Sequence, residues 1–277
     1  MSYLKITIAL SHEHKDMLIA NLNMEGYDSF IETETGIEAF IQKSHFNPTI
    51  LRNVLGHYNI TKRDPLIEEI EDRNWNEEWE KNFDPVFIDD NIVIRATFHE
   101  IGKRYPYDIL IDPKMTFGTG HHQTTQLMMK TQLGISHQGK KVLDIGTGTG
   151  ILSVLAHQLG ASTIDATDTD RGCIENSSEN FKLNNVKNYQ IHKGAVEKLT
   201  FDYSFDIVLA NINKNVLLAE MGYYEKLMSV DAVLILSGFY EKNVPELIQG
   251  AIMHGLEVFD STTLDKWTCL KLARKDK

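Results

Sequence analysis

One stretch decides the fold of this chain: Lys141-Val142-Leu143-Asp144-Ile145-Gly146-Thr147-Gly148-Thr149-Gly150-Ile151-Leu152. An apolar strand runs into an aspartate, then into a glycine-rich turn and then into an apolar helix. Because glycine has no Cβ, the backbone of such a turn can approach a ligand closely. The N-terminus of the helix beyond it offers unpaired N–H groups. The stretch therefore predicts a ligand site at the carboxyl end of a strand in a parallel α/β sheet.

An acidic side chain that binds a ribose is expected about twenty residues farther along, at the end of the next strand. Asp168 stands there, at the end of Ser162-Thr163-Ile164-Asp165-Ala166-Thr167-Asp168. Together, the loop and Asp168 predict a site for a nucleoside-containing cofactor. The alternative is a structural glycine turn with a buried capping Asp144, which leaves Asp168 unexplained.

The spacing of the glycines distinguishes between nucleoside cofactors. It is D-x-G-x-G-x-G here, whereas dinucleotide-binding folds carry G-x-G-x-x-G and use the helix N-terminus for a pyrophosphate. S-adenosylmethionine has no phosphate, and its methionine ammonium suits a carboxylate such as Asp144, directly or through water. The sequence therefore favours S-adenosylmethionine over NAD, with Asp144, Gly146, Gly148 and Asp168 as binding residues.

The composition is that of an ordinary soluble globular protein, with 277 residues, 42% hydrophobic and 24% charged. The length is enough for one large domain or two smaller ones. No run is long and apolar enough to span a membrane, and the N-terminus lacks the apolar core of a signal peptide. Cys173 and Cys269 are too few for a disulfide framework. We therefore expect a cytoplasmic protein without a membrane partner.

The net charge of −11 is unevenly spread along the chain. Between Leu66 and Asn82 there are seven acidic residues against two basic ones. This segment is either a solvated connector or a surface that attracts a basic macromolecular substrate. The acidic balance argues against direct binding of nucleic acid, since phosphates are bound by Lys and Arg.

The first sixty or so residues predict a small α+β domain. Leu4, Ile6, Ile8 and Leu10 alternate as in a strand, and a helix, a hairpin, a second helix and a last strand follow. This β-α-β-β-α-β order is ferredoxin-like. The elements after the first strand are a helix from Ser11 to Met24, strands Phe30 to Glu34 and Ile37 to Ile41 around Thr35-Gly36, a helix from Asn47-Pro48 through Leu55, and a strand Leu66 to Glu71.

A connector and then a larger α/β region follow. Trp75 and Trp79 share one face of a short predicted helix, where they are expected to be packing anchors. From Gln123 onward helices alternate with apolar strands, which predicts a parallel, doubly wound sheet. The predicted helices are Thr124 to Leu133, Gly150 to Leu159, Gly172 to Leu183 and Glu241 to His254. The predicted strands are Asn91 to Ala96, Tyr107 to Ile111, Lys141 to Asp144, Thr163 to Asp168, Tyr189 to His192, Phe205 to Ala210, Ala232 to Ser237, Leu256 to Ser261 and Trp267 to Ala273.

A second unusual stretch, residues 112–125, contains two glycines around Thr119 just before a helix. Such a loop can fold over a ligand, with Thr124 and Thr125 capping the helix or contacting the ligand. A plain turn with a threonine cap explains the stretch equally well. His121 and His122 have no matching Cys, His or Asp spacing, so we expect structural histidines and no metal.

Asn211 follows the apolar strand Phe205 to Ala210 and so stands at a carboxyl strand end, facing the cofactor crevice. Its amide oxygen can accept a hydrogen bond from an amine. A lysine amine has a pKa of about 10.4 and must lose a proton before it can accept a methyl group, which a desolvated pocket favours. A neutral Asn211 could orient the amine without holding it protonated. A strand-end turn is the structural alternative for Asn211.

With these residues in hand, the chain resembles the ribosomal protein L-eleven methyltransferase family over almost its whole length. The motifs that carry the resemblance are Trp75…Trp79…Phe83, Phe117-Gly118-Thr119-Gly120…His122…Thr124-Thr125, Asp144-Ile145-Gly146-Thr147-Gly148-Thr149-Gly150, Ala210-Asn211-Ile212 and Trp267-Thr268-Cys269-Leu270. The Phe-Gly-Thr-Gly-x-His-x-Thr-Thr stretch is distinctive, whereas the glycine loop is shared with many methyltransferases.

The resemblance implies a Rossmann-like, seven-stranded methyltransferase domain over residues 91–277, a linker with a short helix over 72–90, and a ferredoxin-like domain over 1–71 that recognises the ribosomal protein. It implies methylation of lysine side chains and the α-amine of ribosomal protein L-eleven, with S-adenosylmethionine as the methyl donor. We expect the protein to be a monomer. It places Thr125, Gly146, Asp168 and Asn211 against the cofactor, with Phe117 and Gly118 beside it, and makes Asn211 the catalytic residue.

One departure from the family, one excluded class of acceptor and two alternatives accompany this prediction. Asn213 and Lys214 stand where small or apolar residues are expected, which bears on the shape of the acceptor pocket. The chain lacks the Asn-Pro-Pro-Tyr of adenine and glutamine amide methyltransferases, which argues against those acceptors. The alternatives are a methyltransferase for another protein or a small-molecule amine, and a protein that binds S-adenosylmethionine without catalysis.

Overall fold

The computed structural model describes residues 3–10, 15–27, 29–33, 35–58, 60, 65–70, 83–112 and 118–275. The chain forms two compact units, Met1–Lys81 and Asn82–Lys277. The predicted short helix that carries Trp75 and Trp79 lies outside the described residues, as does Phe117. No helix among the described residues has the length and apolar character needed to cross a membrane.

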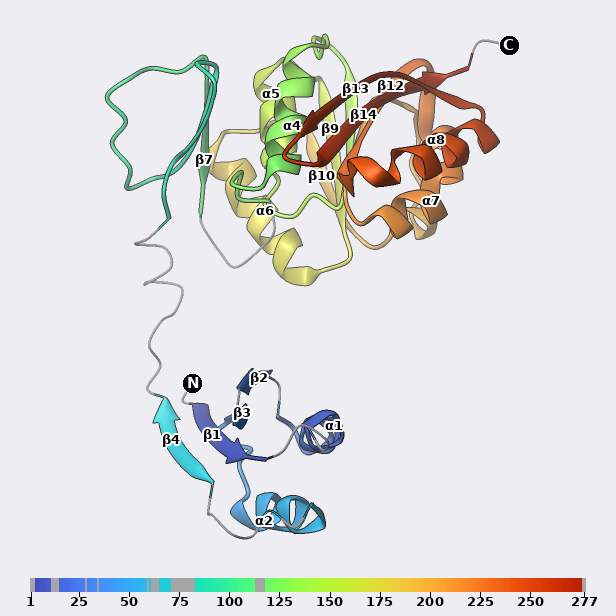
Figure 1. Cartoon of the computed structure of the whole chain (residues 1–277). Helices are drawn as coiled ribbons and strands as arrows, with labels where there is room; N and C mark the ends of the chain where they lie inside the picture. The colour runs from blue at the N-terminus through green and yellow to red at the C-terminus, as the bar shows by residue number, and fades with distance from the viewer. Residues whose placement is uncertain are drawn as a thin grey trace. The chain divides into compact units, whose positions relative to one another are not determined.

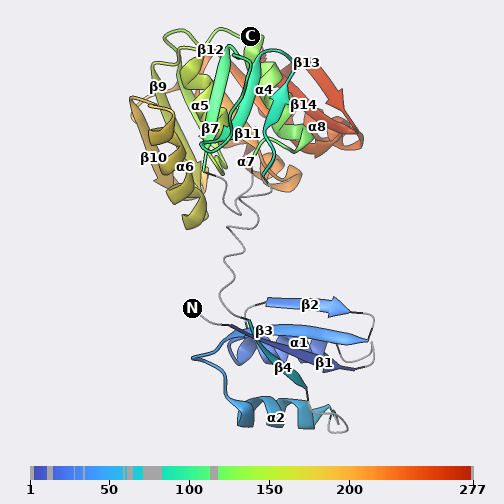
Figure 2. The same cartoon turned by 90° about the vertical axis from the view of Figure 1, so that its left-hand side faces the viewer.

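The N-terminal unit is a four-stranded antiparallel sheet with two helices on one face (Figure 2). Its strand order, β2-β3-β1-β4, and its sequence of elements confirm the predicted ferredoxin-like pattern. The elements are β1 (Tyr3–Ala9), α1 (Lys15–Met24), β2 (Ser29–Thr33), β3 (Gly36–Gln42), α2 (Pro48–His57) and β4 (Leu66–Ile70).

The two faces of this small sheet follow from the alternation in β1. Leu4, Ile6 and Ile8 are buried, and they belong to a core cluster that includes Leu18 of α1 and Leu55 of α2. The residues between them point to the opposite face, because successive strand residues alternate. One face of the sheet is therefore covered by helices, and the other carries the more exposed side chains.

The C-terminal unit is built on a seven-stranded sheet with the order β10-β9-β8-β11-β12-β14-β13 (Figure 1). Strands β10, β9, β8, β11 and β12 pair in parallel, whereas β14 runs antiparallel to both of its neighbours. The strands are β8 (Lys141–Ile145), β9 (Thr163–Asp168), β10 (Tyr189–Lys193), β11 (Phe205–Asn211), β12 (Met228–Tyr240), β13 (Leu256–Leu264) and β14 (Trp267–Arg274). This sheet confirms the predicted methyltransferase-type fold.

The helices of this unit are α4 (Gln123–Leu133), α5 (Ile151–Gln158), α6 (Arg171–Leu183), α7 (Lys214–Leu227) and α8 (Val244–Met253), with short 3-10 turns η2 (Val196–Lys198) and η3 (Glu241–Asn243). Helices α4, α5 and α6 pack in a row, with α4 against β12 and β14, α5 against β8 and β9, and α6 against β9 and β10. Helices α7 and α8 pack on each other and on the core formed with β11, β12 and β13. A second, three-stranded sheet contains β5 (Val86–Ile88), β6 (Ile92–Ala96) and β7 (Tyr107–Ile111). Its β7 packs against α5 and α6.

Two elements differ from the prediction. The predicted elements include no helix between Asn211 and Ala232, and this is wrong, because α7 occupies Lys214–Leu227. Its signals are present in the sequence: Asn213 accepts a hydrogen bond from Asn215 N as an N-cap, and buried residues recur at helical spacing. Strand β5 lies inside the predicted linker 72–90, where it pairs with β6, and the second compact unit begins at Asn82.

Replacing Asn47 with alanine should loosen the start of α2. Asn47 Oδ1 accepts hydrogen bonds from Thr49 N at 2.9 Å and from Ile50 N at 3.4 Å, and the loss of such a cap costs about 1 kcal/mol. The amides of this turn should therefore exchange with deuterium roughly five times faster in the full-length chain. Arg52→Ala, an exposed change in the same helix, is the control, and unchanged exchange in Asn47→Ala would contradict the cap.

Candidate active site

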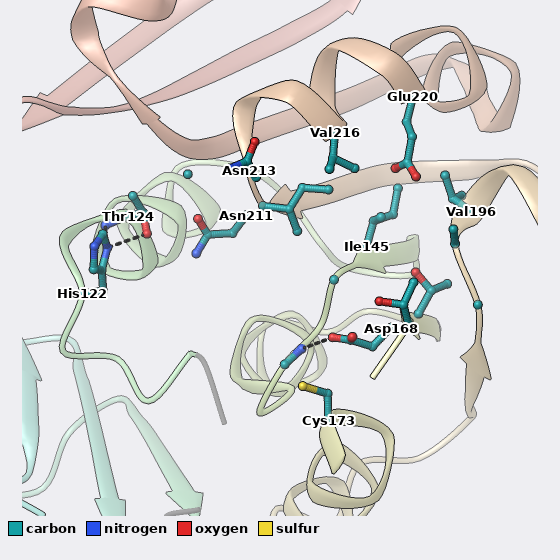
Figure 3. A pocket seen from close by; sticks show the side chains of 18 of the residues that line it. His122, Thr124, Ile145, Asp168, Cys173, Val196, Asn211, Asn213, Val216 and Glu220 are labelled. Carbon is teal, nitrogen blue, oxygen red and sulfur yellow. Dashed lines mark hydrogen bonds between the residues drawn. The ribbon is translucent and has the colours of Figure 1, made fainter. Parts of the chain in front are cut away.

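The glycine-rich loop after β8 is held by the neighbouring strand β9. Gly146 N and Thr147 N both donate to Thr167 O at 2.9 Å. Gly148 N donates to Asp168 Oδ2 at 3.0 Å, and Asp168 Oδ1 accepts from Asp170 N at 3.0 Å. The carboxylate of Asp168 therefore fixes both the loop and the turn that leads into α6, and it does so at the edge of a cavity (Figure 3).

Asp144 lies behind this loop. Its side chain is fully buried, and Oδ2 accepts from Thr147 Oγ1 and Ser153 Oγ, both at 2.7 Å. Burial raises the pKa of the Asp144 carboxyl to about 6, although both hydroxyl groups act against this rise. Asp144 is not among the residues that line the cavity. The contacts that the structure shows for it therefore brace the loop and the first turn of α5.

The cavity has a volume of about 770 Å³ and lies at the carboxyl ends of β8, β9, β10, β11 and β12, as expected for an open α/β sheet. Gly146, Gly148, Asp168 and Asn211 line it, which brings four of the predicted site residues together. The other lining residues are His122, Thr124, Ile145, Thr167, Thr169, Cys173, Gly194, Ala195, Val196, Ile212, Asn213, Val216, Glu220, Gly238 and Trp267.

Asn211 ends β11 and is only 8% exposed. Its Nδ2 donates to Thr125 Oγ1 on α4 at 3.3 Å, whereas its Oδ1 is buried and has no hydrogen-bond partner among the described residues. A buried acceptor without a donor costs free energy. Thr125 itself is buried and does not line the cavity, so it orients Asn211, and Oδ1 remains able to accept from a ligand.

Two glycines allow the strand ends to meet around Ile212. Gly146 has φ +69°, and a Cβ there would collide with Ile212 Cγ2. Gly238 has φ +99°, and a Cβ there would collide with the backbone carbonyl of Ile212. Both backbone conformations favour glycine. The loop after β8 and the end of β12 can therefore approach the segment after β11 closely, which shapes the floor of the cavity.

Aromatic side chains form the wall beside Asn211. His122 caps α4, its Nδ1 lies 2.8 Å from Thr124 Oγ1, and its ring meets Trp267 edge-on at 4.6 Å between centroids. Trp267 in turn lies 4.1 Å from the ring of Tyr240. Burial lowers the pKa of His122, so this wall is uncharged at neutral pH. The sequence predicted a structural role for His122, and the structure adds that His122 lines the cavity.

Three further residues, Gly118, Cys173 and Glu220, differ from the prediction in whether they line the cavity. Gly118 does not line the cavity, and its carbonyl accepts from Thr149 Oγ1 at 2.6 Å. Cys173 does line it, but burial and the nearby Asp168 and Asp170 raise the pKa of its thiol to about 12, which keeps it protonated. Glu220 reaches the cavity from α7, the helix that the prediction missed.

Asn213 and Lys214, the two polar residues that depart from the family's pattern, differ in whether they reach the cavity. Asn213 is the N-cap of α7, with Oδ1 accepting from Asn215 N at 2.9 Å, and it also lines the cavity. Lys214 does not line it, because Lys214 Nζ binds Glu246 Oε2 of α8 at 2.6 Å. The polar pair therefore starts a helix, and the charge of Lys214 is directed away from the cavity.

Replacing Asp144 with asparagine should make unfolding less dependent on pH. A folded-state pKa of about 6, raised from 3.8, means that between about pH 4 and pH 6 the folded chain binds more protons than the unfolded chain. The stability of the wild type therefore falls as pH rises through this window. Relative to wild type, Asp144→Asn should gain up to about 3 kcal/mol between pH 4 and pH 7.

Urea unfolding followed by circular dichroism at several pH values measures this difference. The same comparison for Asp202→Asn, on an exposed loop residue, is the control. A difference between wild type and Asp144→Asn that stays constant from pH 4 to pH 7 would sink the assignment of this pH dependence to Asp144.

Comparison with known proteins identifies the family of this chain. The family model for "Ribosomal protein L11 methyltransferase (PrmA)" matches residues 4–275. A protein of that name from Phocaeicola vulgatus is 37% identical over 281 residues, covering 99% of this chain and 100% of the relative. Another, from Bacteroides fragilis, is 41% identical over 259 residues, covering 92% of each.

A solved structure also matches. The crystal structure of ribosomal protein L11 methylase from Lactobacillus delbrueckii subsp. bulgaricus aligns with a TM-score of 0.65 at 26% identity, and the match covers 70% of this chain and 100% of that chain. The family model spans nearly the whole sequence, and the relatives exceed 30% identity over nearly their whole length. The chain therefore belongs to the ribosomal protein L11 methyltransferase family.

Proposed function

We propose that this chain transfers methyl groups from S-adenosylmethionine to amino groups of ribosomal protein L11, both lysine side chains and the α-amine. The observation that carries the proposal is that Asp168 and Asn211 face one cavity, and that Asn211 Oδ1 has no donor among the described residues. The names of the relatives support the choice of L11. The proposal includes a cytoplasmic monomer that binds its protein substrate without nucleic acid.

The charge and size of the cavity fit S-adenosylmethionine. Its volume of about 770 Å³ lies in the usual range for small-molecule sites. None of its described lining residues is lysine or arginine, and two of them, Asp168 and Glu220, are acidic. Such a lining suits a cofactor that carries a sulfonium and an ammonium, and it does not suit the pyrophosphate of a dinucleotide.

Three of the lining residues have distinct roles in holding this cofactor. Asp168 would accept hydrogen bonds from the ribose hydroxyl groups, as the acidic residue at the end of the second strand does in nucleoside-binding sheets. Gly146, which has no side chain, lets the cofactor approach the backbone at the end of β8. Gly148 is kept in place by Asp168.

The other predicted residues support the site without lining it. Asp144 holds the loop through Thr147, Gly118 is hydrogen-bonded to Thr149, and Thr125 is hydrogen-bonded to Asn211.

Asn211 has the decisive role toward the acceptor amine. When bound, S-adenosylmethionine supplies an electrophilic methyl group on its sulfonium. Asn211 Oδ1 accepts an N–H of the amine and so directs the nitrogen lone pair, while Thr125 keeps the amide from rotating. Because Asn211 and the aromatic wall beside it carry no charge, this part of the cavity, unlike the part with Asp168 and Glu220, places no carboxylate against the amine. Desolvation there lowers the pKa of an entering lysine. Positioning of this kind can contribute about 7–11 kcal/mol.

The N-terminal unit presents a suitable surface for a basic protein. Thr7 of β1 pairs with Glu38 of β3 and Leu66 of β4, and Glu38 pairs with Ile31 of β2, so these side chains share the face opposite the helices. Ile31 is 52% exposed and Leu66 is 58% exposed. On this face Glu38 and Glu68 share one lysine, Lys5, at 3.7 and 2.7 Å. The exposed aliphatic groups therefore lie beside a group of charges with a net negative sum, which can bind a basic partner. We therefore assign substrate recognition to this face of residues 1–71.

Replacing Ile31 and Leu66 together with glutamine should weaken recognition of L11. The loss of two exposed aliphatic contacts should raise KM for L11 about tenfold or more and leave S-adenosylmethionine affinity unchanged. Ile50→Gln, on α2 and 37% exposed, is the control on the other side of the unit. Equal KM values for the wild type and the double variant would contradict the assignment of this face.

Replacing Asn211 with alanine should abolish turnover far more than binding. We expect methyl transfer to fall about 100-fold or more, because the amine loses its orientation, and S-adenosylmethionine affinity to fall less than tenfold. Intact mass spectrometry of L11 measures transfer as mass gains in steps of one methyl group, and calorimetry measures affinity. Asn215→Ala, an exposed asparagine on the first turn of α7, is the matched control.

Each outcome of this experiment has a definite meaning. Wild-type mass gains on L11 establish the reaction and its acceptor. Cofactor binding without any gain on L11 would overturn the choice of acceptor. Undiminished transfer by Asn211→Ala would remove Asn211 from the catalytic role.

A further inference from the structure

The order of the strands predicts the direction in which a bound nucleoside cofactor extends along the cavity. This prediction rests on the proposed function. Neighbouring strands lie about 4.8 Å apart. Along the carboxyl edge, Val196 follows β10, Asp168 ends β9, Gly146 follows β8, and Asn211 ends β11. Gly194 N donates to Asp168 O at 2.9 Å, which joins the first two of these positions.

The chemistry of the cofactor then decides where its base must lie. The ribose bears sulfur through C5′ and the base through C1′, so these two groups extend in opposite directions from it. With the ribose at Asp168 and the transferred methyl group at Asn211, the base extends toward Val196. Figure 3 shows Glu220 and Val196 at one end of the view and His122 and Thr124 at the other.

The end at Val196 has apolar walls suited to the faces of a purine. Ile145 and Val196 are almost completely buried and line the cavity. Helix α7 packs against η2, which brings Glu220 to the same place. The carboxyl group of Glu220 points into the space between Ile145 and Val196 (Figure 3).

Glu220 is held in this position by its own helix. It is 9% exposed, and Oε2 accepts from Tyr224 Oη at 2.7 Å. Burial raises the pKa of Glu220, and the neighbouring Glu197 raises it further. A buried carboxyl group has a free-energy cost unless it is hydrogen-bonded, and its two oxygens offer about four acceptor sites. Tyr224 uses one of these sites and the side chain of Glu197 another, so about two remain for a donor.

We propose that Glu220 recognises the base of the cofactor, by accepting a hydrogen bond from the exocyclic N6 amino group of adenine. Adenine presents that donor on the edge away from the ribose, where a 6-oxopurine presents an acceptor oxygen instead. A site built to pair with a donor rejects an analogue that lacks it, because the buried acceptor is left without a partner. Glu220 therefore selects adenine over a 6-oxopurine.

Calorimetry with two inhibitors tests the proposal on the full-length chain. The first is S-adenosylhomocysteine and the second is its hypoxanthine analogue, S-inosylhomocysteine. The wild type should bind the adenine compound at least about tenfold more tightly. In Glu220→Gln this preference should fall below about threefold, because an amide can both donate to O6 and accept from N6.

Glu225→Gln is the matched control. Glu225 lies on the same helix, and its carboxylate binds Arg274 at 3.1 Å and does not line the cavity. This variant should keep the wild-type preference. A thermal melt of each variant without ligand checks folding, and Glu220→Gln retains an oxygen that can accept from Tyr224.

A third compound makes the test independent of any variant. S-Adenosylhomocysteine with two methyl groups on N6 has no exocyclic donor, so the wild type should bind it at least about tenfold more weakly. A wild type that binds all three compounds alike, or a Glu220→Gln variant that keeps the full preference, overturns the role of Glu220 and leaves the proposed function standing. A wild type that binds none of them overturns the proposed cofactor as well.

Discussion

The hydrogen bond from Gly148 N to Asp168 Oδ2 is the interaction on which the candidate site depends. It joins the loop after β8 to the end of β9, and a second bond from Asp170 N to Asp168 Oδ1 extends this link to α6. Glycine at every second position of this loop leaves its backbone many accessible conformations, and these two bonds restrict it. The same carboxylate faces the cavity, so the group that orders the loop is also the one proposed to hold the ribose.

Carboxyl groups, and a described lining without lysine or arginine, set the electrostatic character of this region. Asp144 braces the loop from below, and burial raises its pKa. Asp168 and Glu220 line the cavity, where the described residues include no lysine or arginine. Lys214, the basic residue nearest to Asn211 in sequence, is bound by Glu246. A positively charged cofactor therefore meets acceptors, and an entering amine meets neutral polar and aromatic groups.

The two compact units divide the proposed work between chemistry and recognition. The C-terminal unit contains every described residue that lines the cavity. The N-terminal unit contains a sheet with one helix-covered face and one face that carries exposed aliphatic and charged side chains. The second face offers a protein acceptor a surface to bind, and it supports the choice of a protein acceptor beside the names of the relatives.

The sequence by itself determined the glycine-rich loop, the aspartate that we propose binds the ribose, and the sheet. Short apolar runs that alternate with helical segments predict the strands of a parallel sheet covered on both faces, and the glycine spacing at Gly146 and Gly148 is local chemistry. Tertiary structure alone decided which distant side chains meet. Thr125 orients Asn211 across 86 positions of sequence, and Trp267 meets His122 because β14 inserts beside β12. Glu220 reaches the cavity through α7, whose helical spacing was visible but whose contact with η2 depends on packing between elements far apart in the chain.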